Sequence, residues 1–382
     1  MNMAALPNYR NRSTRRRNTQ LIHGFMILWA MICLCLAFFA GNLLPEKYLF
    51  DAANIASRFG YVNGFSIGQS YDNTALFYQL LLLSESQSLA GLVFSVIFVI
   101  FVFKCVIAPR CINFGTLHNL LLFSFTCVVG AVYLGQYSKE STSVLLVIIF
   151  MTISGTASGR LIWVVLACAY AVFFRPYWVI VVALYLFFRF FLNRIRSPFI
   201  FLWILIFVFL LLSLAFKLIL GVDLAYYRYM VNDTRIYDVA ANTMINPLFS
   251  GGGVGLEWCN GVAQFFMMFF PIPLLSGNPL YLTFFVIMAS LGVRLVIMLK
   301  KLTDCPRKLR LTKSTESIGL LIAFITVQSI FEPDYGSYIR HLMPMLPVAL
   351  FVTCRSTISY GSSREKRRSM GSLENDTYGT SS

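Results

Sequence analysis

The sequence contains few charged residues for its length. Only 12% of its 382 residues are charged, whereas 58% are hydrophobic and 16% are aromatic. A chain of this length with so little charge is too apolar to form one soluble domain. Residues 198–220 are apolar at nearly every position, and a helix of that kind is surrounded by lipid or by other helices. The composition therefore predicts an all-α polytopic transmembrane helix bundle.

Several common kinds of site are also missing. Only one histidine, His341, and one cysteine, Cys259, fall on the side of the membrane opposite the basic segments described next, which excludes a His/Cys-rich metal site there. A divalent ion bound by carboxylates such as Asp223 or Asp334 stays open. No G-x-S-x-G sequence is present, so serine hydrolase chemistry has no support. We expect neither a metal nor a cofactor.

The basic residues are concentrated in three places. The net charge is +15, and lysines and arginines precede the first apolar run, follow the last one and fill residues 300–313. Such clusters mark cytoplasmic segments. We therefore expect a multi-pass protein of a bacterial inner (cytoplasmic) membrane with both termini in the cytoplasm. No basic domain interleaved with aromatic residues is left to bind nucleic acid.

Apolar length and loop charge together predict about ten spans. An even number returns the chain to its starting side, in agreement with the basic segments at both ends. The predicted spans are residues 21–44, 86–103, 115–134, 142–156, 161–174, 177–191, 198–220, 280–298, 317–330 and 342–352. Residues 1–20 then form a basic cytoplasmic N-terminus, residues 21–355 the transmembrane domain, and residues 356–382 a disordered cytoplasmic tail.

One apolar stretch does not fit this alternation. Counting residues 261–275 as a span would place the basic loop 300–313 outside the cytoplasm, against the charge rule. Pro271 and Pro273 also interrupt the stretch. Broken helices are tolerated at membrane depth only where protein or water satisfies the backbone. The sequence therefore predicts an interfacial or re-entrant helix here, after a long periplasmic loop formed by residues 221–260.

Three short polar insertions lie at span boundaries on the predicted external face. They are Ser138-Lys139-Glu140, Arg175-Pro176-Tyr177-Trp178 and residues 331–341. Charges at an apolar boundary are costly, so they tend to face one another or a watery cavity. Anchoring at the membrane interface is the alternative for each insertion alone. Because all three fall on one face, we expect a shared cavity.

The predicted loop 221–260 combines tyrosines with Arg228 and Arg235. Aromatic rings beside charged groups suit carbohydrate, because sugar C–H faces stack on rings and hydroxyls need polar partners. The same composition suits a lid packed on its own membrane domain, and both interpretations stay open. The glycine run at residues 251–255 is followed by no G-K-[ST], so it indicates a hinge and not a phosphate loop.

A multi-span chain with a long external loop late in the sequence and an Arg-His-ending segment before its last span resembles the bacterial O-antigen and capsular polysaccharide polymerase (Wzy-like) family. The residues that carry this resemblance are Ser138-Lys139-Glu140, Arg175-Pro176-Tyr177 and residues 332–347, which include Arg340-His341-Leu342-Met343-Pro344. The resemblance covers most of the chain as topology but only about twenty residues as motif.

The resemblance implies that oligosaccharide repeat units linked to undecaprenyl pyrophosphate are polymerised into O-antigen, capsule or exopolysaccharide at the periplasmic face. It makes the chain a glycosyltransferase whose partners are the lipid-linked glycan, membrane lipid, a flippase and a chain-length regulator. Guanidinium groups suit the developing charge of a pyrophosphate leaving group. The predicted substrate-binding residues are Lys139, Arg175, Tyr177, Arg228, Arg235 and Arg340.

The acceptor hydroxyl needs a base, and the candidates for this catalytic role are Glu140, Asp334 and His341. Alternatives to a polymerase are an O-antigen ligase, another lipid-linked glycosyltransferase, or a flippase or transporter of lipid-linked sugars. A transporter is expected to show repeats and broken, charged helices near mid-membrane. The charged residues lie at one boundary instead, which favours an enzyme.

Overall fold

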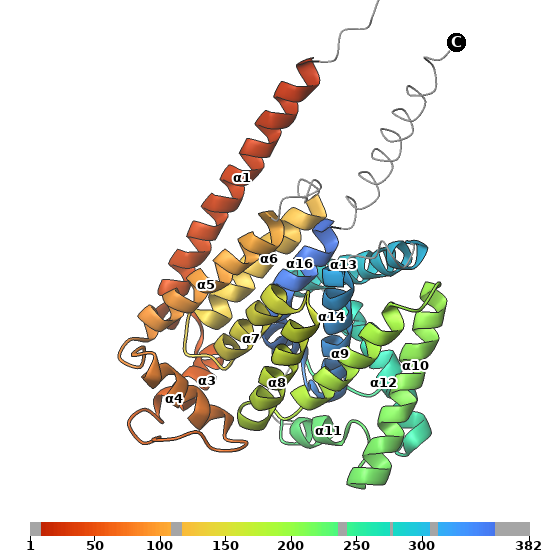
Figure 1. The fold of residues 1–382 in the computed structure, drawn as a ribbon. Helices are drawn as coiled ribbons and strands as arrows, with labels where there is room; N and C mark the ends of the chain where they lie inside the picture. Colours follow the sequence, from red (N-terminus) through yellow and green to blue (C-terminus); the bar gives the residue numbers. More distant parts are fainter. Residues whose placement is uncertain (1–8, 108–116, 236–242, 276–277, 306–311, 356–382) are drawn as a thin grey trace, which may run out of the picture.

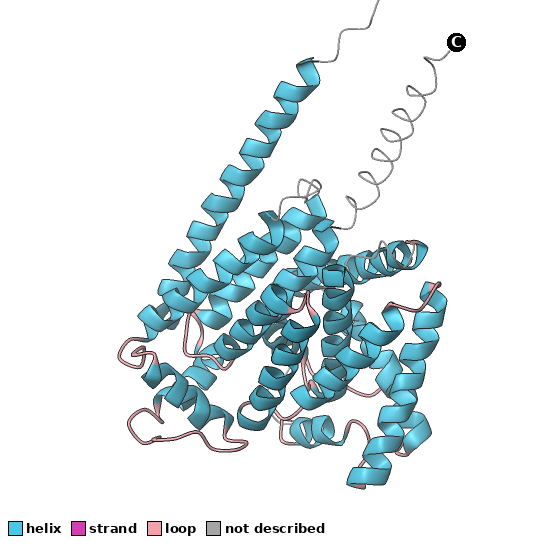
Figure 2. Ribbon diagram, in the orientation of Figure 1, coloured by secondary structure: helices cyan, strands magenta, loops and turns pink. Residues whose placement is uncertain are grey.

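The computed structural model describes residues 9–107, 117–235, 243–275, 278–305 and 312–355, and these are mostly helical (Figures 1 and 2). The first half contains α1 (Tyr9–Phe38), α2 (Ala40–Leu43), α3 (Glu46–Ala56), α4 (Ser70–Leu80), α5 (Gln87–Ile107), α6 (Leu117–Leu134), α7 (Glu140–Ile153), α8 (Ala157–Phe173) and α9 (Trp178–Leu192). The second half contains α10 (Pro198–Ala215), a π-helical turn η1 (Phe216–Leu220), α11 (Tyr226–Asp233), α12 (Val254–Phe269), η2 (Ile272–Leu275), α13 (Pro279–Asp304), α14 (Thr312–Phe331), α15 (Tyr335–Leu342), η4 (Met343–Met345) and α16 (Leu346–Arg355).

Six of the described helices are long and apolar enough to cross a membrane. They are Gln20–Phe38, Gln87–Ile107, Leu117–Leu134, Pro198–Leu220, Pro279–Asp304 and Lys313–Phe331. The shorter apolar helices are Glu140–Ile153, Ala157–Phe173 and Trp178–Leu192. The prediction of an all-helical, membrane-type chain is confirmed for the described residues. Each of the ten predicted spans coincides with helix where it is described, but their number as membrane crossings stays a prediction.

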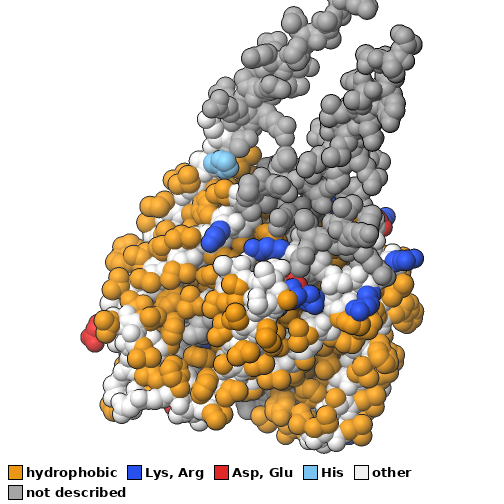
Figure 3. Space-filling model, viewed as in Figure 1, with side chains coloured by type: hydrophobic (Ala, Val, Ile, Leu, Met, Phe, Trp, Pro, Cys, Tyr) orange, Lys and Arg blue, Asp and Glu red, His pale blue; other side chains and the backbone are white. Residues whose placement is uncertain are grey.

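The outer surface is apolar where lipid would contact it. Figure 3 shows a broad hydrophobic face with Lys and Arg side chains along its upper border. Large exposed apolar side chains include Leu161 and Val165 of α8, Val179 of α9, and Phe199 and Trp203 of α10. A soluble protein rarely exposes so continuous an apolar surface. An apolar face of this kind suits a membrane environment.

Helix α14 forms the centre of the bundle. In its most apolar stretch of 18 residues 89% is buried inside the protein, whereas the value for the corresponding stretch of α1 is 22%. It packs against α9, α12 and α16, so it touches both halves of the chain. Because α14 is surrounded by protein, it accommodates polar residues such as Thr326, Gln328 and Ser329 that a lipid-facing helix would not. Its two ends carry the buried carboxylates Glu316 and Glu332.

Glu316 connects three helices near the start of α14. Its Oε1 lies 3.2 Å from a terminal nitrogen of Arg160 on α8 and 2.6 Å from Nε of Arg189 on α9. The hydroxyl of Tyr185 donates to its other oxygen. Glu316 is 1% exposed, so its charge is compensated by two guanidinium groups instead of water.

The opposite end of the bundle, here called the α3 end, is formed by α3, α4, α11, the starts of α7 and α9, and the α14–α15 junction (Figure 1). Two glycines fix the chain there. A Cβ on Gly91 of α5 would lie 2.5 Å from the carbonyl of Gly135, so only glycine allows this close approach. Gly135 leads directly into residues 136–139 before α7. The contact therefore fixes the position of the Lys139-Glu140 segment.

Residues 221–260 were predicted as one long loop, but much of this segment is ordered helix. Helix α11 and the beginning of α12 lie within it. Arg228 and Glu257 are 2% and 1% exposed, and Glu257 accepts hydrogen bonds from the Ala225 backbone and the Tyr229 hydroxyl. These contacts fit the interpretation of a lid packed on its own membrane domain.

Helix α12 covers most of the stretch predicted to be interfacial or re-entrant. It ends at Phe269, before Pro271, and packs against α10, α13 and α14. Its 16 residues give a length of about 24 Å, less than the roughly 30 Å of a bilayer core. That α12 does not cross the membrane stays a prediction. The predicted tail 356–382 lies outside the described residues, and the predicted N-terminus 1–20 is helical from Tyr9.

Candidate functional site

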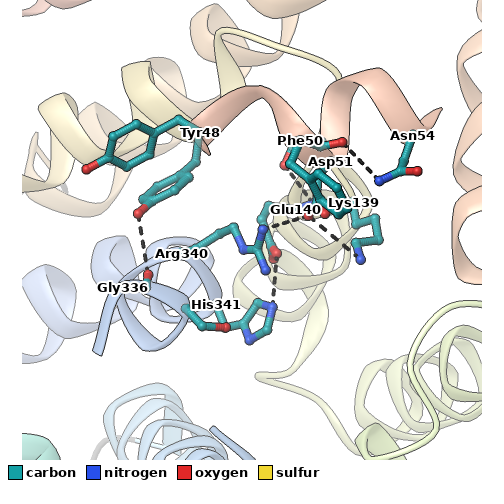
Figure 4. A network of polar contacts seen from close by, with 12 residues as sticks. Tyr48, Phe50, Asp51, Asn54, Lys139, Glu140, Gly336, Arg340 and His341 are labelled. Carbon is teal, nitrogen blue, oxygen red and sulfur yellow. Dashed lines mark hydrogen bonds and ion pairs between the residues drawn. The ribbon is translucent and has the colours of Figure 1, made fainter. Parts of the chain in front are cut away.

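The three polar insertions of the sequence converge at the α3 end. Lys139 and Glu140 lie at the start of α7, Arg175 in the turn between α8 and α9, and Arg340 and His341 on α15. Figure 4 shows Asp51 of α3 above the side chains of α7 and α15, which point toward one another. We call Asp51, Tyr71, Lys139, Glu140, Arg175, Glu332, Arg340 and His341 the charged cluster.

Glu140 and Arg175 form a buried ion pair at its base. The Glu140 carboxylate accepts a hydrogen bond from the Arg175 guanidinium, and the two side chains are 1% and 7% exposed. A second guanidinium nitrogen of Arg175 donates to the Tyr177 hydroxyl at 2.8 Å. The predicted residues Glu140, Arg175 and Tyr177 are therefore in direct contact. Breaking such a pair would leave an uncompensated charge in the interior.

His341 lies between two carboxylates. Its Nδ1 is hydrogen-bonded to Glu332, and its Nε2 lies 3.6 Å from Oε1 of Glu140. The second distance exceeds the normal range of a hydrogen bond. Nε2 therefore has no hydrogen-bond partner among the described residues, and Glu332 fixes the plane of the ring through the other nitrogen.

Burial governs the ionisation of this pair. It raises the pKa of Glu332 to about 7, a shift that the charges of Arg340 and Arg175 only partly offset. Burial, followed by the repulsion from Arg175, holds the pKa of His341 well below its usual value. Both shifts disfavour a charge-separated pair, so His341 stays neutral and the proton of the pair leaves Glu332 near pH 7.

A second group of contacts covers the cluster from α3 and α4. Asp51 Oδ2 accepts a hydrogen bond from Arg340 at 2.6 Å and lies 3.7 Å from Nζ of Lys139. The Tyr71 hydroxyl donates to Oδ1 of Asp51 at 2.6 Å, and Lys139 Nζ lies 3.8 Å from the centre of the Tyr71 ring. Asp51 thus joins α3, α4, α7 and α15.

The ionisation of these groups follows from their pairing. Burial alone would raise the pKa of Asp51, but Arg340, Lys139 and the Tyr71 hydrogen bond together lower it. Burial lowers the pKa of Lys139 to about 8 in spite of Asp51. Lys139 therefore remains mostly protonated at neutral pH, and Asp51 remains ionised.

The cluster gathers three cations around its carboxylates. Arg175, Arg340 and Lys139 supply three cations, whereas Asp51 and Glu140 supply two carboxylates. Glu332 adds a third carboxylate charge when it is ionised, and the neutral ring of His341 adds none. Arg340 is the most accessible of the cations, with 29% of its side chain exposed against 7% for Arg175. The geometry suits an anion that approaches Arg340 and Lys139 first.

The remaining predicted residues lie beside the cluster. Asp334 caps α15 through Oδ1, which accepts from the Ser337 amide at 2.7 Å, and its Oδ2 accepts from Arg235 at 2.8 Å. Arg228 is buried and donates to the Ser329 carbonyl at 3.0 Å. Arg235 is 43% exposed and lies at the surface. Both carboxylate oxygens of Asp334 are therefore engaged, whereas Nε2 of His341 is free to accept a proton.

The sequence did not predict Asp51, Tyr71 or Glu332 as site residues. Glu332 lies in the third polar insertion but was not distinguished there from its neighbours. Asp51 offered one usable signal, because it is the only acid in the otherwise uncharged stretch 48–57. Tyr71 gave no signal, since tyrosine is common in this chain and its role depends on where α4 packs.

Comparisons with protein-family models, with curated proteins and with solved structures find no significant match. Within the described ranges, no group of three or more His, Cys, Asp and Glu side chains is arranged to hold a metal ion. The chemistry of the charged cluster is therefore inferred from its own geometry.

Proposed function

We propose that this chain is a glycosyltransferase of a bacterial inner membrane that polymerises oligosaccharide repeat units linked to undecaprenyl pyrophosphate. The product would be O-antigen, capsule or exopolysaccharide, made at the periplasmic face. The observation that carries the proposal is the charged cluster, in which three cations surround a histidine with an unpartnered Nε2. The cluster lies at the ends of apolar helices, where a lipid carrier would present its pyrophosphate.

The reaction requires one nucleophilic substitution. The acceptor hydroxyl oxygen attacks the anomeric carbon of the donor glycan, and the bond from that carbon to the pyrophosphate oxygen breaks. The leaving oxygen keeps the electron pair, and the hydroxyl proton passes to a base. Undecaprenyl pyrophosphate departs with its added negative charge, which nearby cations stabilise.

The cations divide into an outer and an inner group. Arg340 and Lys139 are partly exposed and would receive the pyrophosphate, displacing Asp51 from both. Arg175 lies deeper and holds Glu140. Arg235 lies at the surface beside α15 and would contact acceptor sugars, with the tyrosines of α11 nearby.

Among the three candidate bases, the geometry favours His341. Asp334 uses both oxygens in a helix cap and an ion pair. Glu140 is held in the buried ion pair with Arg175. His341 is fixed through Nδ1 and offers Nε2, as a general base must.

The proposal requires the α3 end to face the periplasm, with ten crossings and both termini cytoplasmic. Alkaline phosphatase, which is active only outside the cytoplasm, should be active when fused after Asp233 of α11 and inactive when fused after Asp304 of α13. Fusions after Gly155, between α7 and α8, should also be inactive. Activity at Asp304 together with inactivity at Asp233 would invert the topology and exclude a periplasmic site.

Deletion of the gene tests the reaction itself. A polymerase mutant should display surface glycan that carries single repeat units in place of long chains, seen by gel electrophoresis and mass spectrometry. A ligase mutant would instead accumulate lipid-linked polymer with no surface chains. A flippase or transporter mutant would retain single lipid-linked units on the cytoplasmic side. Wild-type chain lengths after deletion would contradict the proposed function.

A further inference from the structure

We propose that Glu332 is a positioning residue for this reaction, because its carboxylate keeps the His341 proton on Nδ1 and leaves the Nε2 lone pair free for the acceptor hydroxyl. This inference rests on the proposed function and assigns a role to a side chain that the reaction does not touch.

The first argument is the hydrogen bond itself. An ionised carboxylate has no proton to give. Nδ1 of His341 must therefore donate the hydrogen bond to ionised Glu332. A neutral imidazole carries only one ring proton, and Nε2 is then a free acceptor. The 3.6 Å separation of Nε2 from Glu140 shows that Glu140 does not compete for this nitrogen.

The second argument is that both partners stand on rigid backbone. The Glu332 amide still bonds to the Gln328 carbonyl at 2.9 Å, which continues the last turn of α14. After Glu332, the Pro333 carbonyl accepts from Ile245 at 2.8 Å, and Asp334 pairs with Met244 in a short bridge. His341 follows on α15, whose start is capped by Asp334. Side chains held in this way keep the geometry that proton transfer needs.

The third argument concerns the step that follows. When Nε2 accepts the hydroxyl proton, the ring becomes an imidazolium in a buried site where Arg175 repels it. The Glu332 carboxylate on Nδ1 then stabilises the new charge, and Glu140 of α7 adds to this. A buried His without such a carboxylate would be a much weaker base.

The arrangement works only while Glu332 is ionised. The charged groups that face the pair are Glu140 of α7, Lys139 beside it, Arg175 of the α8–α9 turn, Arg340 of α15 and Arg228 of α11. A protonated Glu332 would donate to Nδ1 and place the imidazole proton on Nε2, which removes the base. With the pKa of Glu332 raised to about 7, activity should rise with pH through this value.

The test measures rates of polymerisation against pH in membrane vesicles of the deletion strain, which supply their own lipid-linked repeat units. Wild-type protein should show an acid limb near pH 7. Glu332→Gln should lower kcat at least about 100-fold with little change in KM, because the residue does not contact substrate. It should also lose the limb near pH 7, since an amide does not titrate. Glu332→Asp should keep the limb and recover part of the rate.

The matched control is Glu85→Gln, an exposed acid between α4 and α5 that should leave rate and pH profile unchanged. Inactive wild-type vesicles would contradict the proposed function, whatever the variants do. Active wild type with an unaltered rate and limb in Glu332→Gln would overturn the role of Glu332 alone. If Glu332→Gln does not accumulate, Glu332→Asp decides: wild-type kcat overturns the role, and a lower kcat with the limb retained supports it.

Discussion

His341→Asn should stop polymer formation, lowering the rate at least about 100-fold, while the protein accumulates normally. The asparagine amide can take the place of Nδ1 and still donate to Glu332, so the buried carboxylate keeps its partner. The variant lacks only the nitrogen that accepts the hydroxyl proton. Glycan length on gels and protein abundance in membranes, measured on the same cells, check the prediction.

A second histidine serves as the control for His341. His23 is exposed on α1 and makes no contact with the charged cluster among the described interactions, and His23→Asn should leave polymer length unchanged. Long chains produced by His341→Asn at normal abundance would contradict its role as the base. Glu140 would then become the candidate for the general base, although its ion pair with Arg175 would have to break first.

Arg175→Gln is expected to destabilise the fold by about 3–5 kcal/mol, because Glu140 is left buried without its cation. Activity loss in this variant alone would therefore say little about function. The double variant Glu140→Gln/Arg175→Gln removes both charges and should recover most of the stability. Thermal unfolding in detergent and membrane abundance measure this recovery.

The double variant should still fail to make long chains, because no guanidinium remains at the base of the cluster. Arg175→Lys tests the same requirement with the charge kept, since a compact ammonium does not reproduce the planar guanidinium that holds Glu140 and Tyr177 at once. It should shorten the polymer markedly, whereas Arg196→Lys, at an exposed position after α9, should have little effect. Normal polymer from a stable double variant would leave Arg175 as a structural partner of Glu140 only.

The helical architecture could be predicted because apolar length alone specifies it. Residues 198–220, for example, have no soluble alternative, and they form α10 with its π-helical end. The three polar insertions were also predictable, because a charge at an apolar boundary is costly wherever the chain folds. Their convergence places Lys139, Glu140, Arg175, Arg340 and His341 within one cluster.

The pairing inside the cluster could not be predicted, because it depends on contacts between residues far apart in sequence. Arg340 and Asp51 are separated by 289 positions, and only the packing of α3 over α15 brings them together. Arg228 looked like a surface ligand for sugar among tyrosines, yet it is buried against α14. Single-sequence patterns do not distinguish a guanidinium that binds ligand from one that donates to a backbone carbonyl.

The contacts of Glu316 constrain how the chain is inserted during synthesis. Its two arginine partners precede it by 156 and 127 residues, so α8 and α9 are made before the carboxylate that pairs with their cations. Those cations can stay at the lipid headgroups until α14 is made. Helix α14, in contrast, can bury its carboxylate only once both arginines are in place. We therefore expect an α8–α9 hairpin to form early and α14 to dock late, so that the bundle centre closes last.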